Sequence, residues 1–187
     1  MSDRLFDDYF SVRLATKLVP QWLDPEATIP APAELDAELP PLYHLFADLR
    51  ETESELWSQL REEQQSPLAR LLALQSQKLD RLLDQLLVSD IDLAQAIDTV
   101  HFSAGGFSIA RAQADSPLVK VVLTLPGADG APAGQIYAYA RQGGSDAELA
   151  YYEYVSILEE DREKLVRTAL KVQSEQLRAR RARDEEN

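Results

Sequence analysis

The sequence predicts an α+β fold in which a small antiparallel β-barrel or sheet combines with long heptad-bearing helices and a C-terminal helix. Three observations support this prediction. Apolar residues recur with a period of two from about residue 97 to residue 158, as in half-buried strands. Residues 42 to 88 contain no glycine and are rich in Leu, Gln, Glu and Arg, which is typical of long helices. The last part of the chain is again helical in composition.

Residues 1 to 41 are expected to form a strand-like segment and a proline-rich connector. The alternation in YFSVRLATKLVPQW fits a strand. Several prolines follow, the last two at residues 40 and 41. Because proline lacks an amide donor and disfavours regular helix, we expect residues 24 to 41 to be extended.

Residues 42 to 89 are expected to form a helical oligomerisation region. Two helices are predicted, with Ser66 as cap and Pro67 in the first turn of the second helix; a kinked continuous helix is the alternative. Steps of four and three residues place one stripe on the second helix: Leu68, Leu72, Gln75, Leu79, Leu82 and Leu86. Neighbouring leucines widen this stripe, which favours a bundle. The pattern fixes neither the number of chains nor their orientation.

Residues 90 to 187 are expected to form the barrel and the C-terminal helix. Turn sequences such as PGADGAP and RQGGSD separate five short strands. In HFSAGGFSIA the Gly-Gly pair marks a chain reversal between two of these strands. The last helix should run from about residue 159 to residue 183, with acidic residues at its start and arginines at its end, as the helix dipole favours.

Composition excludes several functional classes. A net charge of −13 disfavours nucleic acid and anionic lipid as partners, since phosphate binding draws on clustered Lys and Arg. The chain has no cysteine, so disulfides and thiolate chemistry are excluded. The N-terminal sequence lacks the pattern of a signal peptide and no apolar run is long enough to span a bilayer, so we expect a cytoplasmic protein.

Residue types that carry catalysis are present but do not assemble into a recognisable site. His44 and His101 lie in different regions without acidic residues at ligand spacing, so we expect no metal. In a regular strand His101 and Ser103 would face away from Asp98, which argues against a catalytic triad. We therefore expect no catalytic residue and no cofactor.

The order TVHFSAGGFSIA, VKVVLTLPG, QIYAYARQ, YYEYVSIL and a terminal helix resembles the PilZ domain over roughly residues 95 to 175. That resemblance implies a small β-barrel and, in the family, binding of the bacterial second messenger cyclic di-GMP. Ser103 and Gly106 match the family motif Asp/Asn-x-Ser-x-x-Gly, with His101 in its first position. No arginine lies between Arg81 and Arg111, where the family carries Arg-x-x-x-Arg.

The segment Arg13-Leu-Ala-Thr-Lys17 has the spacing of the missing arginine pair, with Lys in place of the second Arg. Arginine forks grip phosphate and guanine edges bidentately and lysine does not, so a site built on this segment would be weakened. The added helices and the Val-Pro-Gln-Trp segment resemble the atypical, tetramer-forming branch of the PilZ family.

The resemblance and the heptad stripe together predict a non-enzymatic bacterial signalling or scaffold module. We expect it to self-assemble, as a homotetramer, through the helices and to lack cyclic di-GMP binding of the usual kind. Other signalling proteins are a second class of expected partner. The alternative is a cyclic di-GMP receptor that uses the degenerate site.

Overall fold

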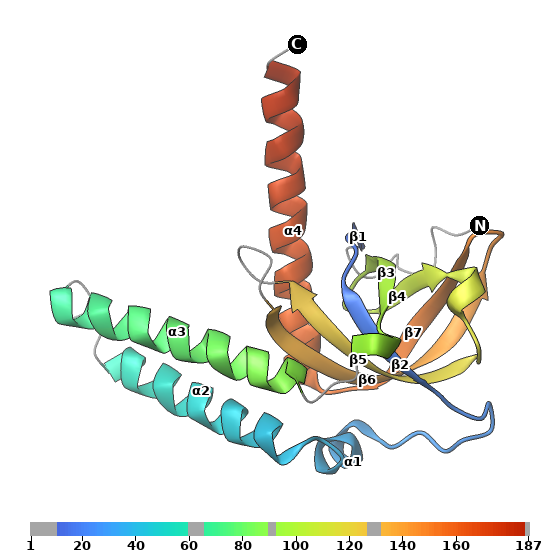
Figure 1. Ribbon diagram of the computed structural model, residues 1–187, viewed down its shortest axis with the longest axis horizontal. Helices are drawn as coiled ribbons and strands as arrows, with labels where there is room; N and C mark the ends of the chain where they lie inside the picture. Colours follow the sequence, from blue (N-terminus) through green and yellow to red (C-terminus); the bar gives the residue numbers. More distant parts are fainter. Residues whose placement is uncertain (1–10, 60–65, 90–92, 127–131, 186–187) are drawn as a thin grey trace.

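The computed structural model describes residues 11–59, 66–89, 93–126 and 132–185. It has the predicted α+β fold: an antiparallel β-barrel, a pair of long helices and a C-terminal helix (Figure 1). The strands are β1 (Val12–Arg13), β2 (Lys17–Trp22), β3 (Ile97–Phe102), β4 (Gly106–Ala110), β5 (Leu118–Pro126), β6 (Pro132–Ser145) and β7 (Leu149–Ile157). The helices are α1 (Pro32–Ala37), α2 (Pro41–Gln59), α3 (Pro67–Ser89) and α4 (Glu159–Glu185), with 3-10 turns η2 (Leu93–Gln95) and η3 (Arg111–Gln113).

The seven strands form one antiparallel sheet in the order β1-β3-β2-β5-β6-β7-β4. An additional pairing between β3 and β4 closes this sheet into a barrel. Each of the strands β2 to β7 therefore has a paired neighbour on both sides, whereas β1 pairs with β3 alone among the described strands. The five strands predicted between residues 97 and 158 are β3 to β7.

The barrel interior is a continuous apolar core. Alternate residues of each strand point inward, as the period of two predicts. The largest side chains in it include two stacked rings, Phe107 and Tyr152, whose centroids lie 5.4 Å apart. One end is covered by α4 through Leu165 and Ala169, both buried. The fold therefore positions α4 by hydrophobic burial against the barrel.

The N-terminal segment supplies two barrel strands. β2 lies between β3 and β5, and Leu18 of β2 pairs with Leu123 of β5. β1 pairs with β3 further along, so that Arg13 lies opposite His101. Residues 9 and 10 of the predicted strand-like segment lie outside the described residues. The barrel thus pairs residues that lie far apart in the sequence, such as Lys17 with Asp98 and Leu18 with Leu123.

The prediction of an extended connector over residues 24 to 41 is wrong in part, because α1 lies within it. Pro32 occupies the first turn of α1, where a helix needs no amide donor. The Glu34 carboxylate accepts a hydrogen bond from the Ala31 backbone N–H at 3.0 Å, and Leu35 is fully buried. Burial of one leucine and this cap stabilise a helix of only six residues.

Helices α2 and α3 lie side by side and form an arm that projects from the barrel (Figure 1). As predicted, α3 begins at Pro67, and the Ser66 hydroxyl accepts a hydrogen bond from the Ala69 N–H at 3.1 Å. The connection over residues 60 to 65 lies outside the described residues. Helix α4 extends past the predicted end at residue 183 and points away from the barrel (Figure 1). No helix in the described ranges is long and apolar enough to cross a membrane.

Candidate functional site

The predicted ligand motif lies at the turn between β3 and β4, where Ser103 is fully buried. Its hydroxyl oxygen accepts hydrogen bonds from the backbone N–H groups of Gly105 at 3.1 Å and Gly106 at 3.2 Å. The hydroxyl also lies 3.3 Å from the Gly106 carbonyl oxygen, to which it donates. All of these partners belong to the turn itself. Ser103 therefore stabilises the chain reversal and presents no free group to a ligand.

Gly106 is required by a close approach of two backbones. A Cβ at this position would collide with the carbonyl oxygen of Tyr152 on β7. Among the described glycines only Gly134 has a positive φ, so the backbone angles of the Gly-Gly pair are open to other residues. We predicted a glycine for the turn conformation. The structure assigns it instead to the packing of β4 against β7.

His101 lies on the outer side of the barrel, between Arg13 of β1 and Ser108 of β4. Its Nδ1 is 3.0 Å from the Ser108 hydroxyl, which already accepts a hydrogen bond from the His101 backbone N–H at 3.2 Å. Since a hydroxyl oxygen can accept two hydrogen bonds, this contact fits either neutral tautomer of the imidazole. Partial burial and then the charge of Arg13 lower the pKa of His101.

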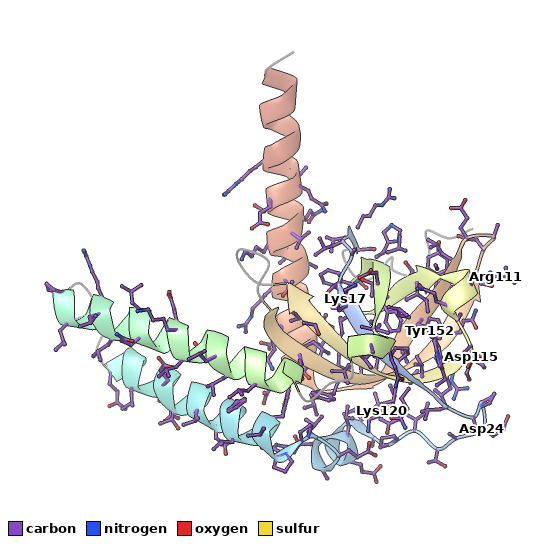
Figure 2. All side chains as sticks on the ribbon, viewed as in Figure 1. Lys17, Asp24, Arg111, Asp115, Lys120 and Tyr152 are labelled. Carbon is purple, nitrogen blue, oxygen red and sulfur yellow. The ribbon has the colours of Figure 1, made fainter. Side chains whose placement is uncertain are left out.

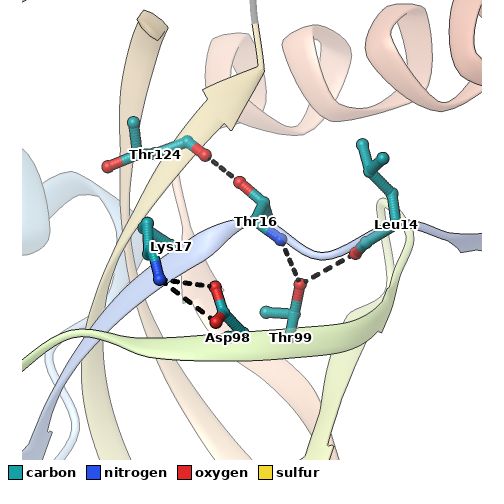
Figure 3. A network of polar contacts seen from close by, with 6 residues as sticks. All are labelled: Leu14, Thr16, Lys17, Asp98, Thr99 and Thr124. Atoms are coloured by element: carbon teal, nitrogen blue, oxygen red, sulfur yellow. Dashed lines mark hydrogen bonds and ion pairs between the residues drawn. The ribbon is translucent and has the colours of Figure 1, made fainter. Parts of the chain in front are cut away.

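Lys17 forms an ion pair with Asp98 at the base of β3. Its Nζ lies 2.9 Å and 3.1 Å from the two carboxylate oxygens (Figure 3). Figure 3 also shows how the segment between Arg13 and Lys17 is held: the Thr99 hydroxyl donates to the Leu14 carbonyl and accepts from the Thr16 N–H. The Thr16 hydroxyl donates to the Thr124 carbonyl. The spacing of Arg13 and Lys17 is therefore fixed by the barrel.

The structure brings Arg13 beside His101 but does not place Lys17 with them. Lys17 lies opposite Asp98 in the sheet. Asp98 is three residues before His101, so the two positions are about 10 Å apart along β3. The Ser103 hydroxyl bonds to backbone groups of the turn, and Gly106 packs against the backbone of β7. What remains at this surface is one exposed guanidinium beside an imidazole whose pKa is lowered. That pair can hold a single anionic group, and the paired strand positions of the described chain place no second arginine beside it.

The second candidate site is the apolar surface of the arm. All members of the predicted stripe on α3 are exposed, and Leu79 is 60% exposed. Between α2 and α3 runs a groove of about 500 Å³. Its walls are Leu49, Thr52, Glu53 and Leu56 from α2 and Leu72, Gln75, Ser76, Leu79, Asp80 and Leu83 from α3. An exposed leucine stripe beside an open groove is a surface that packs against another helix.

The stripe is part of a larger exposed apolar surface on the same two helices. Other half-exposed leucines of the arm are Leu42, Leu45, Leu49 and Leu56 on α2 and Leu71 and Leu74 on α3. Burial of half of a leucine side chain contributes about 1 kcal/mol. Exposed leucines in this number are unusual on the surface of a monomeric protein.

A contact that the sequence did not reveal anchors the arm to the barrel. The Tyr43 hydroxyl of α2 donates a 2.6 Å hydrogen bond to Asp161, which is fully buried in the first turn of α4. Lys164 Nζ lies 2.7 Å from the same carboxylate oxygen. The Tyr43 ring packs edge-on against Tyr137 of β6. Burial, followed by the Asp161 charge, raises the pKa of Tyr43. In the sequence, Asp161 is one of three acidic residues that suit the helix dipole, so nothing marked it as buried.

A second polar cluster fixes the end of α1 to the barrel. The Glu38 carboxylate accepts hydrogen bonds from Lys120 Nζ at 2.6 Å and from the Tyr139 hydroxyl at 2.7 Å. These bonds, with the Lys120 bond the larger influence, lower the pKa of Glu38. Figure 2 shows Lys120 and Lys17 apart on the barrel, so the two ion-paired lysines do not form one cationic patch. In the described part of the chain, no group of three or more His, Asp or Glu is arranged to hold a metal ion.

Comparison with known proteins finds similarity to solved structures. No family model and no curated protein matches the chain. A solved structure of a pathogenic protein from Xanthomonas campestris matches with a TM-score of 0.52 and 18% sequence identity, and covers 92% of both chains. That protein is described as a tetrameric PilZ domain that self-assembles through an unusual helical bundle. The chain therefore has a PilZ-like fold with additional helices, as the resemblance in the sequence predicted.

A second solved structure, the inhibitor of motility of Bacillus subtilis (MotI/DgrA), is 22% identical over 43% of each chain. Its TM-score of 0.35 is too low to support an argument.

Proposed function

We propose that this protein is a non-enzymatic bacterial signalling or scaffold module, a member of the atypical PilZ family that assembles as a homotetramer through its helical arm. The observation that carries the proposal is the exposed leucine stripe on α3 beside the groove between α2 and α3. The assembly described for the Xanthomonas campestris protein supports it, since that match spans the arm as well as the barrel.

Burial of the stripe between copies would account for leucine at five of its six positions. In the isolated chain each of the five stripe leucines leaves roughly half of its side chain in water. Packing against a second copy would remove that area from water, with about 1 kcal/mol gained for each leucine and chain. The connection through Tyr43 and Asp161 would then set the direction in which each barrel points from the assembled helices.

A pair of charge substitutions tests the proposal. Leu79→Asp places a carboxylate in the centre of the stripe, where burial without a partner is costly, so we expect dissociation to monomers. Leu74→Asp is the matched control, because Leu74 is 55% exposed on α3 but lies outside the stripe. Light scattering gives the mass and circular dichroism shows whether the barrel stays folded. An assembly that survives Leu79→Asp, or that dissociates equally with Leu74→Asp, would contradict the proposal.

The alternative function is a cyclic di-GMP receptor with a degenerate site, which the proximity of Arg13 to His101 favours. Each missing arginine contact removes roughly 1 to 3 kcal/mol, so we expect no binding below micromolar concentrations. Calorimetric titration with cyclic di-GMP measures this directly. Submicromolar binding that is lost in Arg13→Ala would establish the alternative. Arg13 is the residue to replace, because it is exposed, whereas replacement of the buried Ser103 would also disturb the turn.

A further inference from the structure

The beginning of α4 contacts two parts of the molecule that lie far apart in the sequence. β7 ends at Ile157 and α4 begins at Glu159, so a single residue separates the barrel wall from this helix. Asp161 and Arg162 follow at once in α4. Because successive residues of a helix point about 100° apart, these two neighbours reach different elements.

Arg162 holds the turn between β3 and β4. Its Nη1 donates a 2.8 Å hydrogen bond to the carbonyl oxygen of Ala104, which is buried. Ala104 lies inside the turn that the Ser103 hydroxyl closes by accepting from the Gly105 N–H. A hydrogen bond from a charged donor to a buried carbonyl is among the stronger kinds in a protein. The guanidinium therefore contributes to the conformation of the turn from outside it.

Asp161 holds the first turn of α2, where the arm begins. The Tyr43 hydroxyl and Lys164 Nζ both donate to its Oδ1, at 2.6 Å and 2.7 Å. Lys164 Nζ also lies 3.3 Å from the Tyr43 hydroxyl oxygen. The second carboxylate oxygen, Oδ2, is buried and has no hydrogen-bond partner among the described residues. Loss of the Tyr43 hydroxyl therefore leaves this buried charge with still fewer donors, which is costly.

The apolar contact between the barrel and the start of α2 includes the same short segment. Leu39 and Tyr43 pack against Tyr137 of β6, and Leu158 is partly buried against this cluster. Leu158 is the residue that joins β7 to α4. Residues 158 to 162 therefore make the apolar contact to α2, the polar contact to α2 and the guanidinium contact to the β3–β4 turn.

We infer that residues 158 to 162 couple the β3–β4 turn to the start of the arm, because one turn of helix holds both. Arg162 positions the turn and Asp161 positions Tyr43, so displacement of this segment weakens the two contacts together. Coupling of this kind is reciprocal: release of α2 loosens the turn as much as release of the turn loosens α2. The inference requires neither a bound ligand nor self-assembly.

Contacts that act independently would behave differently. Each would stabilise only its own element, and the effects of removing both would add. Contacts that share one segment give a response at the distant element and a double variant whose effect is less than additive. Hydrogen exchange of the full-length protein, measured by mass spectrometry, reports both elements at once.

Arg162→Met tests the first direction, since it keeps an unbranched side chain but removes the donor to Ala104. We expect the amides of residues 43 to 46 in α2 to exchange at least about fivefold faster, relative to the paired β5–β6 amides of the same sample. The β5–β6 reference removes any change in global stability. Arg167→Met is the matched control, because Arg167 is an exposed residue of α4 that bonds to Glu163. An unchanged ratio in Arg162→Met, or an equal change in Arg167→Met, would overturn the inference.

Tyr43→Phe tests the reverse direction. We expect the Gly105 and Gly106 amides, which donate to the Ser103 hydroxyl, to exchange at least about fivefold faster relative to β5–β6. Tyr139→Phe is the control, because its hydroxyl bonds to Glu38. No change at the turn, with faster exchange confined to α2, would show that the contacts are independent.

The double variant Arg162→Met/Tyr43→Phe completes the cycle. We expect each element to exchange within about twofold of the faster single variant, because the shared segment is already released. A double variant whose effect equals the product of the two single effects would contradict the coupling. The same ratios are expected in the Leu79→Asp background, so failure of this inference is distinguishable from failure of the proposed self-assembly.

Discussion

At the scale of single residues, the motif at the β3–β4 turn has a structural purpose. Ser103 holds two backbone N–H groups of the turn, and Gly106 leaves room for the carbonyl of Tyr152. Both residues are needed by the barrel whether or not a ligand binds. The presence of Ser103 and Gly106 is therefore explained by the fold alone and does not by itself indicate a ligand site.

Replacement of Gly106 tests this account. Gly106→Ala forces β4 and β7 apart, so we expect the free energy of unfolding to fall by about 1 to 3 kcal/mol. Urea denaturation measures the change. Glu153→Ala is the control, because Glu153 is the exposed partner of Gly106 in the β4–β7 register. Equal stability of Gly106→Ala and the unmodified protein would contradict the steric role.

Tyr152 is expected to make the stability of the barrel fall at alkaline pH. Its ring is buried in the barrel (Figure 2) and its hydroxyl donates a 2.8 Å hydrogen bond to the Ser116 carbonyl. Burial raises the pKa of Tyr152 to about 12, above the usual value of 10.0. The neutral form is thus favoured in the fold, and its contribution is complete below pH 10 and lost as pH rises toward 12.

We therefore expect the urea midpoint to fall between pH 10 and pH 12, and to fall less steeply in Tyr152→Phe, which keeps the ring but cannot ionise. Urea titrations at a series of pH values measure both slopes. Identical slopes in the two proteins would show that Tyr152 ionisation does not destabilise the barrel.

At the scale of elements, the sequence predicts individual strands and helices from local patterns but does not predict which distant elements contact one another. The period of two in residues 119 to 125 identified a strand, and the stripe from Leu68 to Leu86 identified an exposed helix face. Such patterns are local, so the sequence shows them. The pairing of Leu18 with Leu123 and the bond from Tyr43 to Asp161 join distant residues, and no local pattern specifies them.

The short helix α1 shows a different limit. Six residues give too little periodicity to outweigh the prolines around them, and it is the burial of Leu35 that stabilises the helix. At the candidate ligand site, the spacing of Ser103 and Gly106 was visible in the sequence. In the closed barrel, however, the Ser103 hydroxyl bonds to the turn and Gly106 lies against the backbone of β7. These contacts could not be predicted from the spacing.

The bond between Tyr43 and Asp161 predicts how the arm is anchored. Tyr43→Phe leaves a fully buried carboxylate without its hydroxyl donor, so we expect a loss of about 1 to 3 kcal/mol and faster amide exchange at the start of α2. Tyr139→Phe is the control, since its partner Glu38 is partly exposed and can bind water instead. Hydrogen exchange measured by mass spectrometry compares the two. Equal effects would contradict a special role for the buried anchor.

At the scale of the whole molecule, a chain of net charge −13 carries an arm whose leucines are exposed. In the proposed assembly, burial of the apolar surface of the arm supplies the attraction between copies. The proposed assembly would form through the arm, with the barrels displayed around it.

The most direct test of self-assembly is the mass of the unmodified protein by light scattering over a range of concentrations. The account predicts a single species of four times the 21.0 kDa chain mass at micromolar concentration, with little change on dilution. A mass of 21.0 kDa at the same concentration would contradict it.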